Sequence, residues 1–157
     1  MNTPADVIES LGRGPALITV LVLELPPHLR KWRPRPTKWS GHEHACHVAR
    51  MEPMWAARVE RILAEDNPTI IGYNPDEDEV PDALLGVDLA TSLASYASGR
   101  TVLRRRLQGL AAADWDRPAV HTEHGRYSLF LMCRHLALHD RLHAYRIEEI
   151  LLSKDLP

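Results

Sequence analysis

The most constraining feature of the sequence is the stretch from Arg134 to Tyr145, in which three histidines follow one another at intervals of four residues. Residues four apart lie near one face of an α-helix, about 6 Å apart along its axis. The neighbouring apolar residues repeat with the same period, so this stretch predicts an amphipathic helix with two histidines among its core positions. These positions are Leu129, Met132, Leu136, His139, His143, Ile147 and Ile150.

Two more helices are predicted in the first half of the chain. The first runs from Asp6 to about Leu25, with its first turns expected to be separate because glycines and a proline interrupt the pattern. Its apolar positions are Val7, Ile8, Leu11, Leu17, Val20, Leu21 and Leu23. The second helix begins at a capping box formed by Ser40 and Glu43 and is expected to run to about Glu65.

The second half of the chain predicts a third helix from Val87 to Ala113 and a fourth that Ser128 caps and that runs to about Leu152. A long loop from Asp66 to about Gly86, which contains the acidic run Asp76–Glu79, separates helices two and three. No pair of strands is predicted. The chain is therefore expected to be all-α, a single four-helix bundle over residues 1–157.

Composition limits the possible partners and compartments. The net charge is −2 over 157 residues, so we expect neither a nucleic-acid-binding nor an anionic-membrane-binding protein. The longest apolar run, Ala16–Leu25, is too short to cross a bilayer. No signal peptide is expected at the N-terminus. The two cysteines, Cys46 and Cys133, are expected to be buried, inert thiols, which fits a reducing cytoplasm.

Histidines in a core need partners, and one metal ion can serve several of them. Zinc and nickel bind neutral imidazole, and three protein ligands leave a position open for water or substrate. His139 and His143 form the strongest pair, and a third ligand is expected from helix two. That helix offers His42, His44 and His47, of which periodicity slightly favours His44. The alternative is a set of buried histidines held by hydrogen bonds.

The segment from His139 to His143 also resembles the His-Glu-x-x-His helix of metalloproteases, with Asp140 in place of glutamate. We give this interpretation little weight. Aspartate is one methylene shorter, and no third ligand of the expected kind follows.

Several short motifs occur in a characteristic order: Trp39-Ser40, Glu43, His47-Val48-Ala49, Gly125-x-x-Ser128-Leu129 and His139-Asp140-x-x-His143. In these motifs the chain resembles the DinB/YfiT-like superfamily of small metal-binding four-helix bundles. The resemblance implies that His47, His139 and His143 are the metal ligands. It places His44 where the family usually has an apolar residue, and His135 outside the ligand set. It also implies an up-down-down-up bundle, with a long crossover between helices two and three.

The resemblance further implies a function. Characterised relatives include transferases and isomerases that use low-molecular-weight thiols such as bacillithiol or mycothiol, so a metal-dependent thiol S-transferase acting on an electrophilic co-substrate is expected first. A hydrolase using a metal-bound water, with Asp140 or Glu43 as candidate base, comes second, and a non-catalytic, stress-related metal-binding protein third. A homodimer is also expected. Candidate donors to the thiol are Arg50, Arg134, Arg141 and Arg146.

Overall fold

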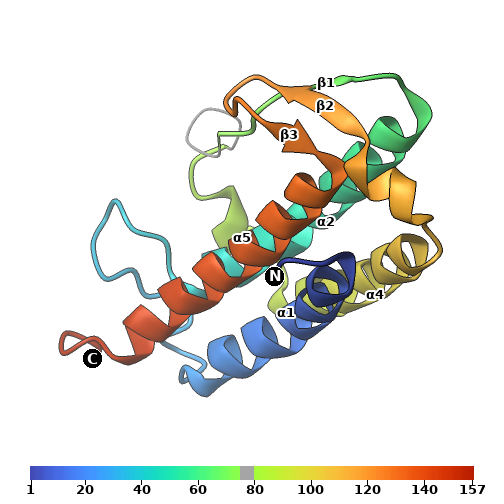
Figure 1. Cartoon of the computed structure of the whole chain (residues 1–157). Coiled ribbons are helices and arrows are strands. Elements are labelled where there is room, and N and C mark those ends of the chain that lie inside the picture. Colours follow the sequence, from blue (N-terminus) through green and yellow to red (C-terminus); the bar gives the residue numbers. More distant parts are fainter. Residues whose placement is uncertain (75–79) are drawn as a thin grey trace.

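A computed structural model describes residues 1–74 and 80–157, so the acidic run Asp76–Glu79 lies outside the described residues. Four long helices dominate the described chain, which confirms the predicted all-α four-helix bundle (Figure 1). The helices and strands, in chain order, are α1 (Pro4–Glu24), α2 (Gly41–Ala64), β1 (Thr69–Ile70), the 3₁₀ helix η1 (Ala83–Gly86), α4 (Leu89–Gln108), the 3₁₀ helix η2 (Ala112–Asp116), β2 (Pro118–His121), β3 (Tyr127–Ser128) and α5 (Leu129–Leu151).

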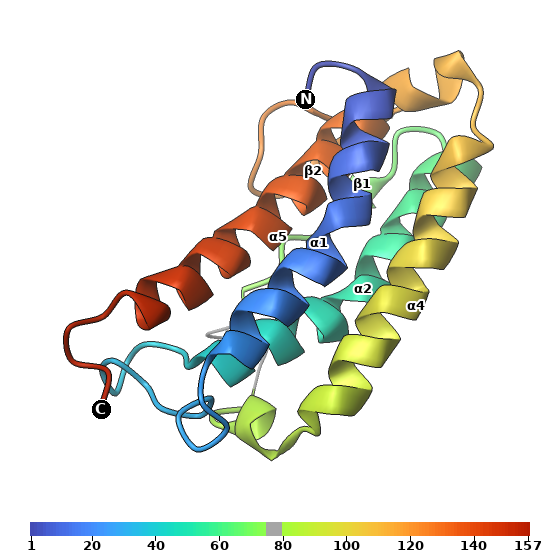
Figure 2. The same ribbon diagram turned by 90° about the horizontal axis from the view of Figure 1, so that it is seen from below.

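The helices run up, down, down and up in chain order (Figures 1 and 2). Helix α1 packs against α5 and α4, and α2 packs against the same two helices. Because α2 and α4 run in the same direction, the end of one and the start of the other lie at opposite ends of the bundle. The connection between them passes through residues 75–79, so the full path of the expected crossover stays a prediction.

Polar side chains fix the helix starts. Ser40 accepts a hydrogen bond from the Glu43 amide while the Glu43 carboxylate accepts from the Ser40 amide, so the predicted capping box is present. Ser128 accepts from the Leu131 amide and caps α5, also as predicted. These caps place the first turns of the two helices that carry the histidines of interest.

Helix α1 differs from the prediction in two ways. It is continuous through Pro15, because a proline inside a helix removes one hydrogen bond without necessarily ending it. Its buried face matches the expected one at Val7 and Leu11, but Leu17, Val20 and Leu23 in its second half are exposed. The positions that α1 actually buries are Val7, Ser10, Leu11, Gly14, Ile18 and Val22.

Two further predictions were wrong. Helix α4 ends at Gln108 rather than at Ala113, with Gly109 at its C-terminal cap. The connector that follows contributes strands β2 and β3, although no strand pair was expected. Strand β2 pairs in parallel with β1 and antiparallel with β3 in a small three-stranded sheet at one end of the bundle (Figure 1). Strands of two to four residues are too short to show the alternating pattern that identifies a strand in a sequence.

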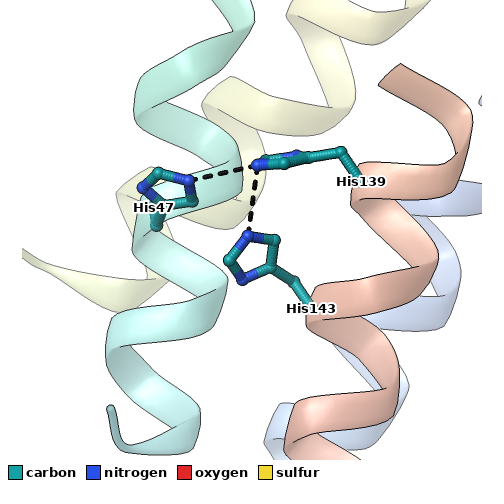
Figure 3. A group of neighbouring side chains, drawn as sticks. All are labelled: His47, His139 and His143. Atoms are coloured by element: carbon teal, nitrogen blue, oxygen red, sulfur yellow. Dashed lines mark hydrogen bonds between the residues drawn. The ribbon is translucent and has the colours of Figure 1, made fainter. Parts of the chain in front are cut away.

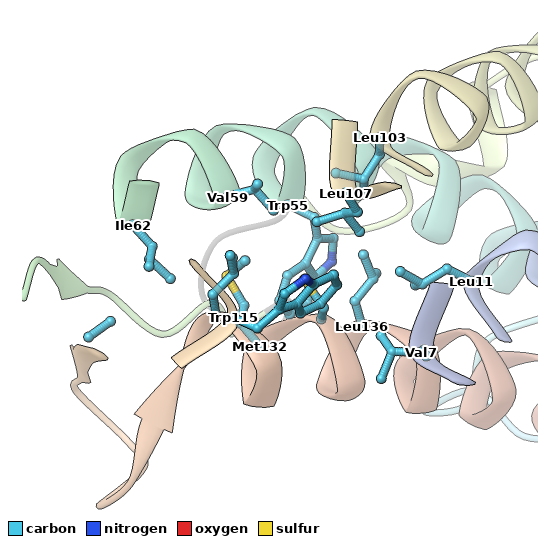
Figure 4. Close-up of a cluster of buried hydrophobic side chains, with 14 of the residues drawn as sticks. Val7, Leu11, Trp55, Val59, Ile62, Leu103, Leu107, Trp115, Met132 and Leu136 are labelled. Carbon is cyan, nitrogen blue, oxygen red and sulfur yellow. The ribbon is translucent and has the colours of Figure 1, made fainter. Parts of the chain in front are cut away.

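Apolar side chains from all four helices fill the interior. One buried cluster lies near the sheet and joins α1, α2, α4, η2 and α5 (Figure 4). Its labelled members are Val7, Leu11, Trp55, Val59, Ile62, Leu103, Leu107, Trp115, Met132 and Leu136. Within the described ranges, no helix combines the length and apolarity that a membrane crossing requires.

Candidate metal centre

Three histidines from two helices converge between α2 and α5 (Figure 3). Nε2 of His139 lies 3.2 Å from Nε2 of His47 and 3.1 Å from Nε2 of His143. His139 and His143 are one helical turn apart on α5, and His47 faces them from α2. His47 and His143 are buried and His139 is half-buried. The structure therefore brings together the three residues that the family resemblance implied.

Hydrogen bonding alone does not satisfy this arrangement. An imidazole nitrogen offers either one proton or one lone pair in the ring plane. Nε2 of His139 therefore cannot make good hydrogen bonds to both His47 and His143, although both lie within reach. A single cation that accepts one lone pair from each ring would satisfy all three nitrogens. The donor set fits a borderline transition metal such as zinc or nickel.

The surroundings keep these imidazoles neutral, which is the form that binds metal. Burial, followed by the neighbouring histidines, lowers the pKa of His47 to about 3. Burial also lowers the pKa of His139 to about 4 and holds that of His143 far below its ordinary value. No proton therefore has to be displaced when a cation binds near neutral pH.

His44 lies behind His143 rather than beside the three Nε2 atoms. Its Nδ1 is 2.9 Å from Nδ1 of His143, the nitrogen that points away from the centre. The ring of Trp39 packs against those of His44, His47 and His143, with centroid distances of 5.4, 4.9 and 6.1 Å. The slight preference of helical periodicity for His44 as the central histidine is therefore not the arrangement seen.

The other histidines considered from the sequence lie elsewhere. His42 is buried, with Nε2 3.0 Å from the backbone oxygen of Leu84 in η1. The ring of His135 contacts those of Trp55 and His124, at centroid distances of 5.6 and 5.4 Å. Neither residue belongs to the converging group of three.

Asp140 points away from the metal centre into a buried ion network. Arg100 of α4 donates to both oxygens of Asp140 and, at 2.8 and 2.9 Å, to both oxygens of Glu52. All three side chains are almost fully buried. A Cβ on Gly14 would overlap the Asp140 carboxylate, so this glycine lets α1 approach the network closely. The carboxylate of Asp140 is therefore held by Arg100 and is not free to act as a base.

Glu43, the other base considered, is also engaged. Arg33 donates to both of its oxygens, and the Ser40 amide and hydroxyl donate to the same carboxylate at 2.9 and 2.7 Å. Burial works to raise the pKa of Glu43, but the hydrogen bonds from Arg33 and Ser40 outweigh it and bring that pKa below its ordinary value. Glu43 therefore belongs to the start of α2.

Two cavities of the described structure lie apart from His47, His139 and His143. A cavity of about 490 Å³ lies between α2 and α4, lined by residues such as Ala49, Gly99 and Leu103. A smaller one of about 200 Å³ lies beside Trp39, with Arg33 and Glu43 on its wall. The Trp39 ring lines this smaller cavity and also packs against the rings of His44, His47 and His143. Trp39 therefore separates the smaller cavity from the histidines.

Sequence reasoning missed Arg100, although a signal for it existed. Arg100 stands four residues after Tyr96 and three before Leu103, in register with the apolar face of its helix. A charged residue on such a face requires a buried partner of opposite charge. The pattern could therefore have predicted a buried ion pair, with the carboxylates of Glu52 and Asp140 as candidates.

Fold and site together define a class: a four-helix bundle whose second and last long helices bring three histidines into one group suited to a divalent cation. The chain belongs to the DinB superfamily, whose family model matches residues 10–147.

One solved structure matches over nearly the whole chain. It is that of YfiT from Bacillus subtilis, described as a probable metal-dependent hydrolase with an unusual four-helix bundle topology. The two proteins are 20% identical, the TM-score is 0.83, and the match covers 95% of this chain and 86% of that one. At this identity the likeness establishes the shared fold. No curated protein matched the sequence.

Proposed function

We propose that this protein is a metal-dependent S-transferase that uses a low-molecular-weight thiol of the bacillithiol or mycothiol type. His47, His139 and His143 would hold a divalent cation, which would act as a Lewis acid and lower the pKa of a bound thiol. The thiol loses its proton to solvent, and its sulfur forms a bond to an electrophilic carbon. The leaving group departs with the electron pair of the broken bond.

We favour the transferase over the hydrolase because both candidate bases, Asp140 and Glu43, are already bound by other groups. A general base that takes a proton from the attacking water assists hydrolysis. Asp140 is held by Arg100, and Glu43 is held by Arg33 and the helix cap. A thiol is far more acidic than water, so a Lewis acid suffices to deprotonate it without a carboxylate.

The four arginines considered as donors to the thiol differ in their availability. Arg146 pairs with Glu149 at 2.7 Å, and the guanidinium of Arg134 lies over the ring of Phe130. Arg141 is exposed on α5, two residues before His143. Arg50 lies one turn after His47 on α2 and makes an interaction of its own. Residues two apart do not share a helix face, so Arg141 points away from His143. Arg50, in contrast, lies near the face of His47, and its charge acts on that ring. We propose Arg50 as the first donor to test.

The likeness to YfiT favours a second candidate, a metal-dependent hydrolase. In that case the same three histidines would hold the cation, and the pKa of a water at the open position would fall toward 7. The third candidate, a metal-binding protein without turnover, needs the same ligands but no substrate pocket.

Metal content tests the shared part of these proposals. We expect close to one divalent ion per purified chain, and its loss from the variant with His139→Ala and His143→Ala. The exposed His28 offers a matched control, since His28→Ala should keep the ion. A metal content in the double variant equal to that of the wild type, measured by elemental analysis, would exclude the assigned ligands.

A substrate panel separates the candidates. Bacillithiol, mycothiol, glutathione and cysteine are each offered with an electrophilic dye, and ester and amide substrates are offered without thiol. Conjugation that disappears in the double variant supports the transferase. Metal-dependent hydrolysis without conjugation supports the second candidate, and no turnover in either arm leaves the non-catalytic one. The expected homodimer is tested on the same samples by sedimentation.

A further inference from the structure

The hairpin between β2 and β3 carries a second group of metal-type ligands. His121 ends β2, and Glu123 and His124 follow in the turn. One donor atom from each of these residues lies within 4.8 Å of the other two. The rings of His121 and His124 stack with centroids 4.4 Å apart. His121 is buried and the other two residues are exposed, so the group opens to solvent.

The small sheet and one glycine hold this group in place. The Thr122 amide donates to the oxygen of Ile70 in β1 at 3.1 Å, and the Gly72 amide donates to Thr122 Oγ1 at 2.8 Å. The Glu123 carboxylate lies directly against Gly72, where a Cβ would overlap it. The missing side chain at Gly72 therefore leaves the space that keeps the carboxylate near the two imidazoles.

A purely structural role explains only part of this arrangement. The Glu123 amide donates to Nδ1 of His121 at 3.1 Å, which accounts for the orientation of that ring. Burial, followed by the charges of His124 and Arg58, lowers the pKa of His121, so the ring is neutral near pH 7. The His124 ring also packs against the rings of Tyr127 and His135. Neither these contacts nor the amide hydrogen bond accounts for the Glu123 carboxylate beside the two imidazoles.

We propose that His121, Glu123 and His124 form a second site for a divalent transition-metal ion such as Zn²⁺ or Ni²⁺. Two imidazoles and a carboxylate are a donor set that these ions accept, with solvent completing the coordination. The site shares no ligand with His47, His139 and His143.

The second site binds more weakly than the first. A cation needs a lone pair of His121, and the Glu123 amide uses the one on Nδ1. Coordination through either ring nitrogen gives up that hydrogen bond, because a neutral ring that coordinates through Nε2 carries its proton on Nδ1. The three Nε2 atoms of the first site lose no such bond to the backbone.

Calorimetric titration of the metal-free full-length chain with Zn²⁺ tests the proposal. We expect two binding events in the wild type, the second weaker than the first. The variant with His139→Ala and His143→Ala should keep only the second event. His124→Ala changes an exposed residue, so it should leave the fold intact. Because it removes a ligand, it should weaken the affinity of the second event more than the loss of an outer-shell partner does, which is about 10- to 100-fold.

Two further variants separate a built site from adventitious binding. Gly72→Ala removes no ligand but displaces the Glu123 carboxylate, so it should also weaken the second event. His28→Ala removes an exposed histidine elsewhere and should change neither event. The proposal would be overturned if the wild type showed no binding event that both His124→Ala and Gly72→Ala weaken. A missing first event with the second intact would count against the three-histidine centre alone.

Discussion

The Nδ1 atoms of His44 and His143 lie 2.9 Å apart, so one of these nitrogens carries a proton and donates a hydrogen bond that the other accepts. When Nε2 of a neutral His143 gives its lone pair to a cation, the ring proton is on Nδ1 and His44 is the acceptor. His44 then fixes both the tautomer and the orientation of His143. Carboxylates and carbonyl groups more often play this part behind metal-binding histidines.

We therefore predict that His44→Ala lowers the metal affinity about 10- to 100-fold. His44→Gln keeps an acceptor in the side chain and should lose less. Competition with a chelator for Zn²⁺ measures both affinities, and circular dichroism checks that both variants fold. Equal affinities in the wild type and His44→Ala would show that His44 only fills space.

A second prediction concerns the buried ion network. Arg100→Leu leaves the Glu52 and Asp140 carboxylates buried without their partner, so it should lower the free energy of unfolding by about 3–5 kcal/mol. Arg106 on the same helix supplies a matched control, since its pair with Glu60 is exposed. Arg106→Leu should cost about 1 kcal/mol or less. Urea denaturation compares the two, and equal losses would contradict the role given to the network.

The third prediction is a pH effect of His42. Burial lowers the pKa of His42 below its ordinary value of 6.5, although its contact with the Leu84 oxygen opposes this shift. Below pH 6.5 the unfolded chain binds more protons at His42 than the folded chain does. The stabilisation is therefore complete above pH 6.5 and is lost as the pH falls through the lowered pKa.

Unfolding measured across this range should thus show a steeper loss of stability with falling pH in the wild type than in His42→Gln. Replacing the exposed His28 by glutamine should leave the wild-type slope unchanged. Identical slopes in the wild type and His42→Gln would mean that His42 has the same pKa in both states.

The fourth prediction concerns the two cysteines. Burial raises the pKa of Cys133 to about 12 and also raises that of Cys46. Because the thiolate is the reactive form, neither thiol should react with iodoacetamide in the folded protein at mildly alkaline pH. Both should react once urea unfolds the chain, and mass spectrometry counts the added groups. Rapid labelling of the folded protein would show that a cysteine is open to solvent.

The histidines of α5 and the caps of α2 and α5 were readable from the sequence because their signals are local. His139 and His143 are four residues apart, and Ser40 and Glu43 three apart, so helix geometry alone relates each pair. The sequence did not predict that α1 continues without a break through Pro15. The neighbouring Gly14 meets Asp140 of α5, which is far away in the chain, and no local pattern indicates this contact.

Distant relationships were decided by the tertiary structure. The sequence by itself determined that α2 and α5 each carry histidines on one face, but periodicity slightly favoured His44 over His47, which is the histidine that meets His139 and His143. The choice between His44 and His47 depends on how α2 is rotated against α5, which is set by packing across the whole bundle. The same rotation places His44 behind His143. The pairing of β1 with β2 brings Gly72 against Glu123, which no local pattern in either segment could indicate.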